Sequence, residues 1–159
     1  IEKLNTQILD QVNLKTMVDR VLEQLGPELE ATQALVSVKL NNITSVNFLV
    51  PYMESILYNV LGNAVKYRNP ERRLKIEISA EEEKDFIRLE IRDNGLGIDL
   101  AKHEKDMFKL YKRFHTHVEG KGLGLYLVKT QLTTLGGRLK VESTLDVGTT
   151  FILYFKKNN

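Results

Sequence analysis

The sequence contains no cysteine among its 159 residues, which excludes disulfide bonds, cysteine nucleophiles and cysteine metal sites and is compatible with a reducing compartment. No apolar run approaches the ~18 residues that a membrane-spanning helix needs, and the first residues lack the pattern of a signal peptide. The net charge of +2 is too small to indicate a nucleic-acid partner. We therefore expect a cytoplasmic domain that does not bind nucleic acid.

The composition, 42% hydrophobic and 28% charged residues, fits one globular domain large enough to bury a core. Its charge is unevenly distributed along the chain. Between positions 102 and 121 six basic residues stand against three acidic ones, namely Lys102, Lys105, Lys109, Lys112, Arg113 and Lys121 against Glu104, Asp106 and Glu119. Such a cluster suits either a solvated surface or an anionic ligand.

The loop after one predicted strand holds a candidate for a ligand contact. Apolar and charged residues alternate over residues 86–92, which predicts a half-buried strand, and Asp93-Asn94-Gly95-Leu96-Gly97-Ile98 follows it. A carboxylate thus emerges from the end of the strand, and Gly95 and Gly97 allow the backbone to turn sharply and approach a ligand closely. Because an aspartate before glycine is also an ordinary turn former, this loop alone leaves both interpretations open.

A helix is predicted to begin at Pro51 and to end near Tyr67. One broad face is apolar and consists of Met53, Leu57, Val60, Leu61, Ala64 and Val65. The opposite face is polar and consists of Ser55, Asn59, Asn63 and Lys66. Surface asparagines are ordinary, but inside a helix each costs roughly several tenths of a kcal/mol relative to alanine. A functional role for the two amides and a plain surface position are both open at this point.

Further periodicities predict the remaining elements. Leu4, Ile8 and Val12 have helical spacing, so we expect residues 1–12 to be the end of a helix that begins outside this chain. Asn13 is predicted to cap a second helix, which Gly26-Pro27 interrupts. Strands are predicted over residues 35–40, 46–50, 74–78, 86–92, 138–143 and 150–155, with the third and fourth forming a hairpin.

A second glycine-rich stretch lies further along the chain. The polar, lysine-rich stretch from the end of the Asp93 loop to Gly120 lacks a clear period, and we expect a long lid with short helical turns there. Gly120-Lys121-Gly122-Leu123-Gly124-Leu125 then opens a helix whose core face is Leu125, Val128, Leu132 and Leu135. Free backbone N–H groups at a glycine-rich helix start favour a phosphate group. The spacing is that of neither a P-loop nor a dinucleotide fingerprint.

Four of these stretches together resemble the catalytic ATP-binding domain of sensor histidine kinases, in the GHKL superfamily with gyrase and heat-shock chaperones. Residues 59–67 resemble the N box, residues 93–97 the G1 box, residues 108–114 the F box, and residues 120–125 the G2 box. Four boxes in this order, with a lid between the two glycine boxes, are specific, and the resemblance covers residues 14–155. It implies a two-layer α/β sandwich of the Bergerat type, with a mixed sheet and helices on one face.

The resemblance implies ATP and Mg²⁺ as ligands and gives roles to individual residues. Asp93 would accept a hydrogen bond from the adenine amino group, and Thr149 would help to hold this carboxylate. Asn63 would bind Mg²⁺ with Asn59 beside it, since magnesium prefers hard oxygen ligands. The phosphates would be met by Lys66, Arg113 and Tyr67, and the nucleotide site would be completed by Gly95, Gly97, Lys121, Gly122, Leu123, Gly124 and Leu125.

The residue four positions before Asn63 separates reaction types in the superfamily that the chain resembles. ATP-hydrolysing relatives carry a glutamate there that activates water, whereas Asn59 has an amide, which cannot serve as a general base. Glu54 lies half a turn off that face and is a poor substitute. The resemblance therefore implies phosphoryl transfer to a histidine, with Asn59, Lys66 and Arg113 as the catalytic residues. A non-catalytic nucleotide-binding or dimerisation module and a water-activating ATPase are the alternatives.

No histidine of this chain stands out as the phosphoryl acceptor. His103, His115 and His117 all fall in the expected lid, outside the His-Glu context that the family uses. We expect the acceptor on an upstream dimerisation domain of the same full-length protein, with residues 1–12 as the end of its helix and residues 13–159 as the catalytic domain. A response regulator is the second expected partner. The full-length protein is expected to be a homodimer, while this fragment can be monomeric and its parent can be anchored in a membrane.

Overall fold

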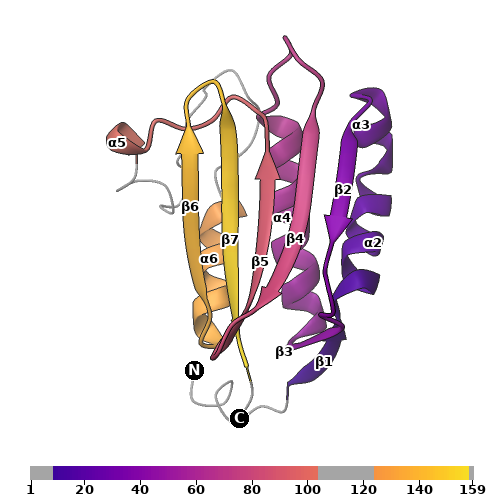
Figure 1. Ribbon diagram of the computed structural model, residues 1–159, viewed down its shortest axis with the longest axis vertical. Coiled ribbons are helices and arrows are strands. Elements are labelled where there is room, and N and C mark those ends of the chain that lie inside the picture. Colours follow the sequence, from indigo (N-terminus) through magenta and orange to yellow (C-terminus); the bar gives the residue numbers. More distant parts are fainter. Residues whose placement is uncertain (1–8, 104–123, 158–159) are drawn as a thin grey trace.

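The computed structural model describes residues 9–103 and 124–157, and its centre is a five-stranded sheet. The strands are β2 (Leu35–Lys39), β4 (Lys75–Glu82), β5 (Phe86–Asp93), β6 (Arg138–Thr144) and β7 (Gly148–Lys156). They lie in the order β2-β4-β5-β7-β6 (Figure 1). β2 and β4 are parallel, and every other neighbouring pair is antiparallel, which confirms the predicted mixed sheet and its β4–β5 hairpin.

Helices cover one face of this sheet (Figure 1). They are α2 (Leu14–Gln24), α4 (Val50–Lys66) and α6 (Gly124–Thr134), with the shorter α3 (Gly26–Ala31) and α5 (Leu100–His103) at the periphery. The apolar side chains of the helices and of the inner sheet face form one core. The predicted two-layer α/β sandwich is therefore confirmed. In the described part of the chain, no helix is both long and apolar enough to span a membrane.

The apolar face of α4 sets the direction of its polar face. Pro51 lies in the first turn, and all six predicted core residues are buried, as is Ile56, which the prediction omitted. Burying one aliphatic side chain of this kind stabilises a fold by about 1.5–3 kcal/mol, so these contacts fix the rotation of the helix. Asn59 and Asn63 are thereby held on one side of α4.

The predicted start of α2 is confirmed. The side-chain oxygen of Asn13 accepts a hydrogen bond from Thr16 N at 2.9 Å, which caps the helix. α2 ends at Gln24, and Gly26-Pro27 begins the separate short helix α3, as the sequence predicted.

The prediction of a helix over residues 1–12 is wrong for residues 10–12. β1 (Asp10–Asn13) is a strand, and it pairs antiparallel with β3 (Ser45–Phe48) in a separate two-stranded sheet. Val12 is buried opposite Val46, so pairing with a distant segment and burial override the helical spacing. β1 therefore belongs to the folded domain and not to an upstream helix; residues 1–8 lie outside the described residues.

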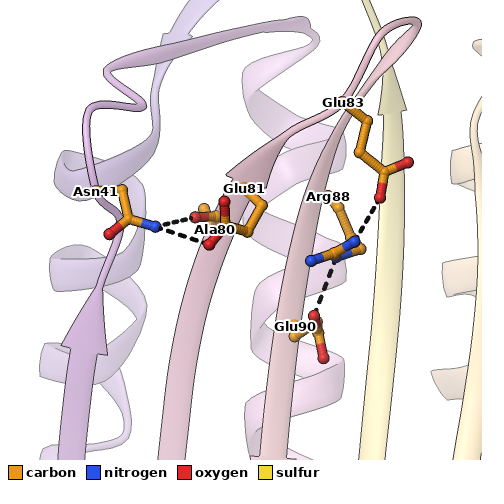
Figure 2. Close-up of polar contacts among 6 residues, drawn as sticks. All are labelled: Asn41, Ala80, Glu81, Glu83, Arg88 and Glu90. Carbon is orange, nitrogen blue, oxygen red and sulfur yellow. Dashed lines mark hydrogen bonds and ion pairs between the residues drawn. The ribbon is translucent and has the colours of Figure 1, made fainter.

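Polar contacts attach the turn after β2 to β4, and others lie on the face of the sheet that the helices leave open (Figure 2). Asn41, whose φ is +55°, donates through Nδ2 to Ala80 O at 2.8 Å and so extends the attachment of this segment to β4. On β5, Arg88 lies between Glu83 and Glu90 and forms an ion pair with each. Partly exposed ion pairs contribute only ~0–1 kcal/mol each, so the core on the other face stabilises the sheet far more.

Candidate functional site

Asp93 is the last residue of β5, and two backbone N–H groups hold its carboxylate. Its Oδ1 atom accepts hydrogen bonds from Gly95 N at 2.8 Å and from Thr149 N at 3.3 Å. Because Asp93 lies opposite Thr149 in the β5–β7 ladder, the register of the sheet places the second donor. Among the residues that the structure describes, Oδ2 has no hydrogen-bond donor, so this oxygen is available to a ligand.

Burial raises the pKa of Asp93 from 3.8 to about 6, and the hydrogen bonds from Gly95 and Thr149 oppose this rise. The ionised carboxylate is therefore costly in the absence of a further donor. At about pH 7.5 it is still mostly ionised and acts only as an acceptor. Carboxylates with strongly perturbed pKa values concentrate at functional sites, which favours ligand recognition over a plain turn for Asp93.

The glycines of the Asp93 loop are required by close contacts within the protein. A Cβ atom on Gly95 would lie 2.5 Å from Tyr67 O. A Cβ atom on Gly97, whose φ is +72°, would lie 2.1 Å from Thr144 O. The loop therefore packs between the end of α4 and the β6–β7 turn. The sequence suggested that Gly95 and Gly97 allow a ligand to approach closely. In the structure, both glycines instead allow close contact with the protein's own backbone.

Asn59 and Asn63 lie one turn apart on α4, and Asn59 faces the start of α6. Asn59 Nδ2 donates to Ser55 O at 2.8 Å, and a Cβ atom on Gly124 would lie 2.9 Å from Asn59 Oδ1. Asn63 is half-buried, and no described group bonds its side-chain amide. Within the described residues, both side-chain oxygens are thus free of protein donors. Oxygens of this kind are suitable ligands for a hard cation.

The end of α4 joins this polar face to the Asp93 loop. Lys66 is the last helical residue and is exposed, and Tyr67 caps the helix with its N–H bonded to Asn63 O. The carbonyl of Tyr67 in turn accepts a hydrogen bond from Leu96 N at 2.8 Å. The end of α4, the end of β5 and the β6–β7 turn therefore lie together, at the upper end of the molecule in Figure 1.

Part of the predicted site lies outside the described residues. This part comprises Arg113, Lys121, Gly122 and Leu123, and with them most of the expected lid. Gly124 is the first residue of α6, which confirms the helix that the second glycine-rich stretch predicted. Its predicted core face is also confirmed, since Val128 and Leu132 are buried while Leu125 and Leu135 pack against the core.

Thr149 bonds Asp93 through its backbone and not through its hydroxyl group. The Thr149 side chain is buried, and its Oγ1 lies 2.7 Å from Ser143 Oγ. Ser143 Oγ also accepts from Ile98 N at 2.8 Å and donates to Gly148 O at 2.9 Å. Ser143 was not among the predicted site residues, although it is a polar residue at a position where the alternation of β6 predicts an apolar one.

Two further residues that the sequence analysis did not assign to the site hold the Asp93 loop against the start of β4. The Asn94 side chain accepts from Lys75 N at 2.8 Å and donates to Arg73 O at 2.9 Å. Arg72 donates to Asn94 O at 2.7 Å and to Gly95 O at 2.8 Å. Their partners are backbone groups, which leave no side-chain pattern in the sequence.

Comparison with known proteins assigns the chain to a family. A family model described as "Histidine kinase-, DNA gyrase B-, and HSP90-like ATPase" matches residues 50–159. Sensor protein RprX of Bacteroides fragilis is 33% identical over 155 residues, which are 95% of this chain and 27% of that protein. Histidine protein kinase SaeS of Staphylococcus epidermidis is 30% identical over 155 residues, or 94% of this chain and 44% of that protein. In fold, the catalytic domain of histidine kinase ThkA is similar with a TM-score of 0.81 at 21% identity, over 95% of this chain and 97% of that one.

The chain belongs to the histidine kinase-, DNA gyrase B- and HSP90-like ATPase family, and it has the fold of a histidine kinase catalytic domain. The matched residues include α4, the Asp93 loop and the start of α6. The description of the family names an ATPase, so ATP is the nucleotide that the family indicates. The chain spans less than half the length of the two curated relatives.

Proposed function

We propose that this chain is the ATP-binding catalytic domain of a sensor protein-histidine kinase, which transfers the γ-phosphoryl group of ATP to a histidine. The observation that carries the proposal is the Asp93 carboxylate. Gly95 and Thr149 hold one of its oxygens, and the other, which receives no donor from the described residues, would accept the adenine amino group. A hydrogen bond to a charged acceptor of this kind is worth about 1.5–3 kcal/mol. The triphosphate would extend from there toward α4 and the start of α6.

The polar face of α4 fits a magnesium ion. The side-chain oxygens of Asn63 and Asn59 would hold Mg²⁺, which binds through few protein ligands and completes its shell with phosphate oxygens and water. Among the described residues, no group of three His, Cys, Asp or Glu side chains could hold a metal. The ion would supply charge neutralisation at the phosphates, and Lys66 at the end of α4 would add a cation beside them.

The surroundings of Asn59 support phosphoryl transfer over ATP hydrolysis. An amide cannot remove a proton from water, and the Asn59 nitrogen already bonds the backbone of its own helix. The nearby carboxylate of Glu54 accepts from Gln24 at 2.8 Å and lies 3.7 Å from Arg20, so it is engaged with α2. The described part of the Asn59–Asn63 face therefore holds no general base for an attacking water.

The acceptor histidine would lie on a dimerisation domain of the same full-length protein, and a response regulator would receive the phosphoryl group next. A direct test mixes this chain with ATP labelled in the γ-phosphate, Mg²⁺ and that dimerisation domain. We expect acid-labile, alkali-stable label on the dimerisation domain, as phosphohistidine requires, and much less label with the Asp93→Asn variant.

Two other outcomes of this experiment would overturn the proposal in different ways. Sustained release of free phosphate by this chain alone would indicate a water-activating ATPase. Saturable ATP binding without any transfer to the histidine domain would indicate a non-catalytic nucleotide-binding module.

A further inference from the structure

Arg72 lies outside every motif of the site, in the connection between α4 and β4, yet its guanidinium group reaches two loops at once. Nε donates to Asn94 O at 2.7 Å and Nη2 to Gly95 O at 2.8 Å, both in the loop after β5. Nη2 also donates to Asp146 O at 2.6 Å and to Val147 O at 3.3 Å, both in the β6–β7 turn. One side chain thus joins segments that are about fifty positions apart in the sequence.

These two segments lead to the two donors that hold the Asp93 carboxylate. Gly95, a carbonyl partner of Arg72, gives its N–H to Asp93 Oδ1, and Thr149, two residues after Val147, gives the second N–H. The segments also touch directly, since a Cβ atom on Gly148 would lie 2.1 Å from Asp93 O. The position of the carboxylate therefore depends on the separation of the loop and the turn.

The chemistry of the contact explains why an arginine suits this position. Carbonyl oxygens from both segments converge on one point, and their like partial charges repel unless a cation lies between them. The guanidinium group offers several N–H donors in a rigid plane, so it can satisfy both segments at the same time. A lysine ammonium keeps the charge but has no fixed fork of donors. Arg72 is exposed, so its charge also remains solvated.

We propose that Arg72 is a positioning residue for adenine recognition. It holds the loop at Asn94-Gly95 and the turn at Asp146-Val147 at the separation at which Gly95 and Thr149 both bond Asp93. This inference rests on the proposed binding of ATP at Asp93. Its consequence is that Arg72 controls the contribution of the base to nucleotide affinity, while the phosphate contacts on α4 are independent of it.

The test compares ATP and GTP binding by the wild-type chain, Arg72→Ala, Arg72→Lys and Arg73→Ala. GTP carries a carbonyl where ATP carries the amino group, so the ratio of the two dissociation constants reports on Asp93. Arg73→Ala is the matched control, because the Arg73 side chain donates to Gln33 O, away from the Asp93 loop, and the substitution keeps the Arg73 carbonyl that Asn94 bonds. We expect Arg72→Ala to lose on the order of tenfold in ATP affinity and to lose most of its preference over GTP, with Arg72→Lys intermediate and Arg73→Ala near wild type.

A purely structural role would give a different pattern. The positioning role is overturned if Arg72→Ala weakens the binding of ATP and of GTP by the same factor. It is also overturned if ATP binding falls only in proportion to a smaller folded fraction, measured by circular dichroism. Unchanged ATP affinity and preference in both Arg72 variants would also overturn it. A wild-type chain that binds neither nucleotide would count against the proposed function itself, so the two failures are distinguishable.

Discussion

Replacement of Asp93 by asparagine is expected to weaken ATP binding and, in the same variant, to stabilise the ligand-free domain. Asparagine keeps the shape of the side chain and an oxygen for the Gly95 and Thr149 N–H groups. It places an NH₂ group where Oδ2 would accept the adenine amino group, so donor meets donor. The expected loss of about 1.5–3 kcal/mol corresponds to a ten- to hundredfold weaker ATP affinity.

The stability effect follows from the pKa of Asp93, which burial raises from 3.8 to about 6. Because the native state holds the proton more tightly than the unfolded state, the free energy of unfolding falls as the pH rises through this interval and remains lowered above it. A shift of about two pKa units corresponds to roughly 3 kcal/mol at most, and partial exposure of Asp93 reduces the cost. We expect a cost of about 1–2 kcal/mol at neutral pH, which Asp93→Asn removes.

Calorimetric ATP titration and urea unfolding at several pH values measure both effects. The asparagine variant should be the more stable protein above about pH 7 and should lose this advantage below about pH 4, where wild-type Asp93 is protonated. Asp85→Asn, an exposed carboxylate in the β4–β5 turn, is the control that should change neither property. Unchanged ATP affinity would refute the adenine assignment, and a stability gain independent of pH would refute the burial argument.

Three further substitutions, with one control, test other parts of the structure. Gly97→Ala should destabilise the domain by at least ~1–3 kcal/mol in urea unfolding, because φ is +72° and the new Cβ would meet Thr144 O. Gly62→Ala is the control in α4: its Cβ would lie in open space, so this substitution should be neutral or stabilising. Asn13→Ala should cost about 1 kcal/mol by the same assay through loss of the α2 cap, and no loss would contradict that role. Asn63→Ala should remove the dependence of ATP binding on Mg²⁺ while metal-free binding persists; calorimetry with and without the ion decides this.

The elements that the sequence predicted well are those whose signal is local. α4 shows a continuous apolar face with Pro51 in its first turn, and α2 begins at the predicted Asn13 cap. The β4–β5 hairpin shows two alternating strands across a short acidic turn. In each case side chains near one another in the sequence also determine the local structure, so periodicity and capping suffice.

β1 illustrates what a local pattern cannot show. Val12 continues a helical spacing along the chain, but it is buried because it pairs with Val46, more than thirty positions away. A four-residue strand has little intrinsic preference of its own, so its distant partner decides the outcome.

The predicted site likewise combines residues that a local sequence pattern reveals with contacts that it does not. Asp93, Asn59 and Asn63 were identified because their side chains form recognisable motifs. Thr149 was predicted to help hold the Asp93 carboxylate, and it does so through its own N–H group. Arg72 was not predicted, because it bonds backbone carbonyls, which leave no side-chain pattern. Contacts of this kind become visible only when the loop after β5 and the β6–β7 turn are placed side by side.

We propose that this domain binds ATP through Asp93 and Mg²⁺ through the asparagines of α4. Calorimetric titration of the chain with ATP, with and without Mg²⁺, tests it most directly. We expect saturable one-to-one binding that magnesium strengthens. The absence of saturable binding at millimolar ATP, or an affinity that magnesium leaves unchanged, would contradict it.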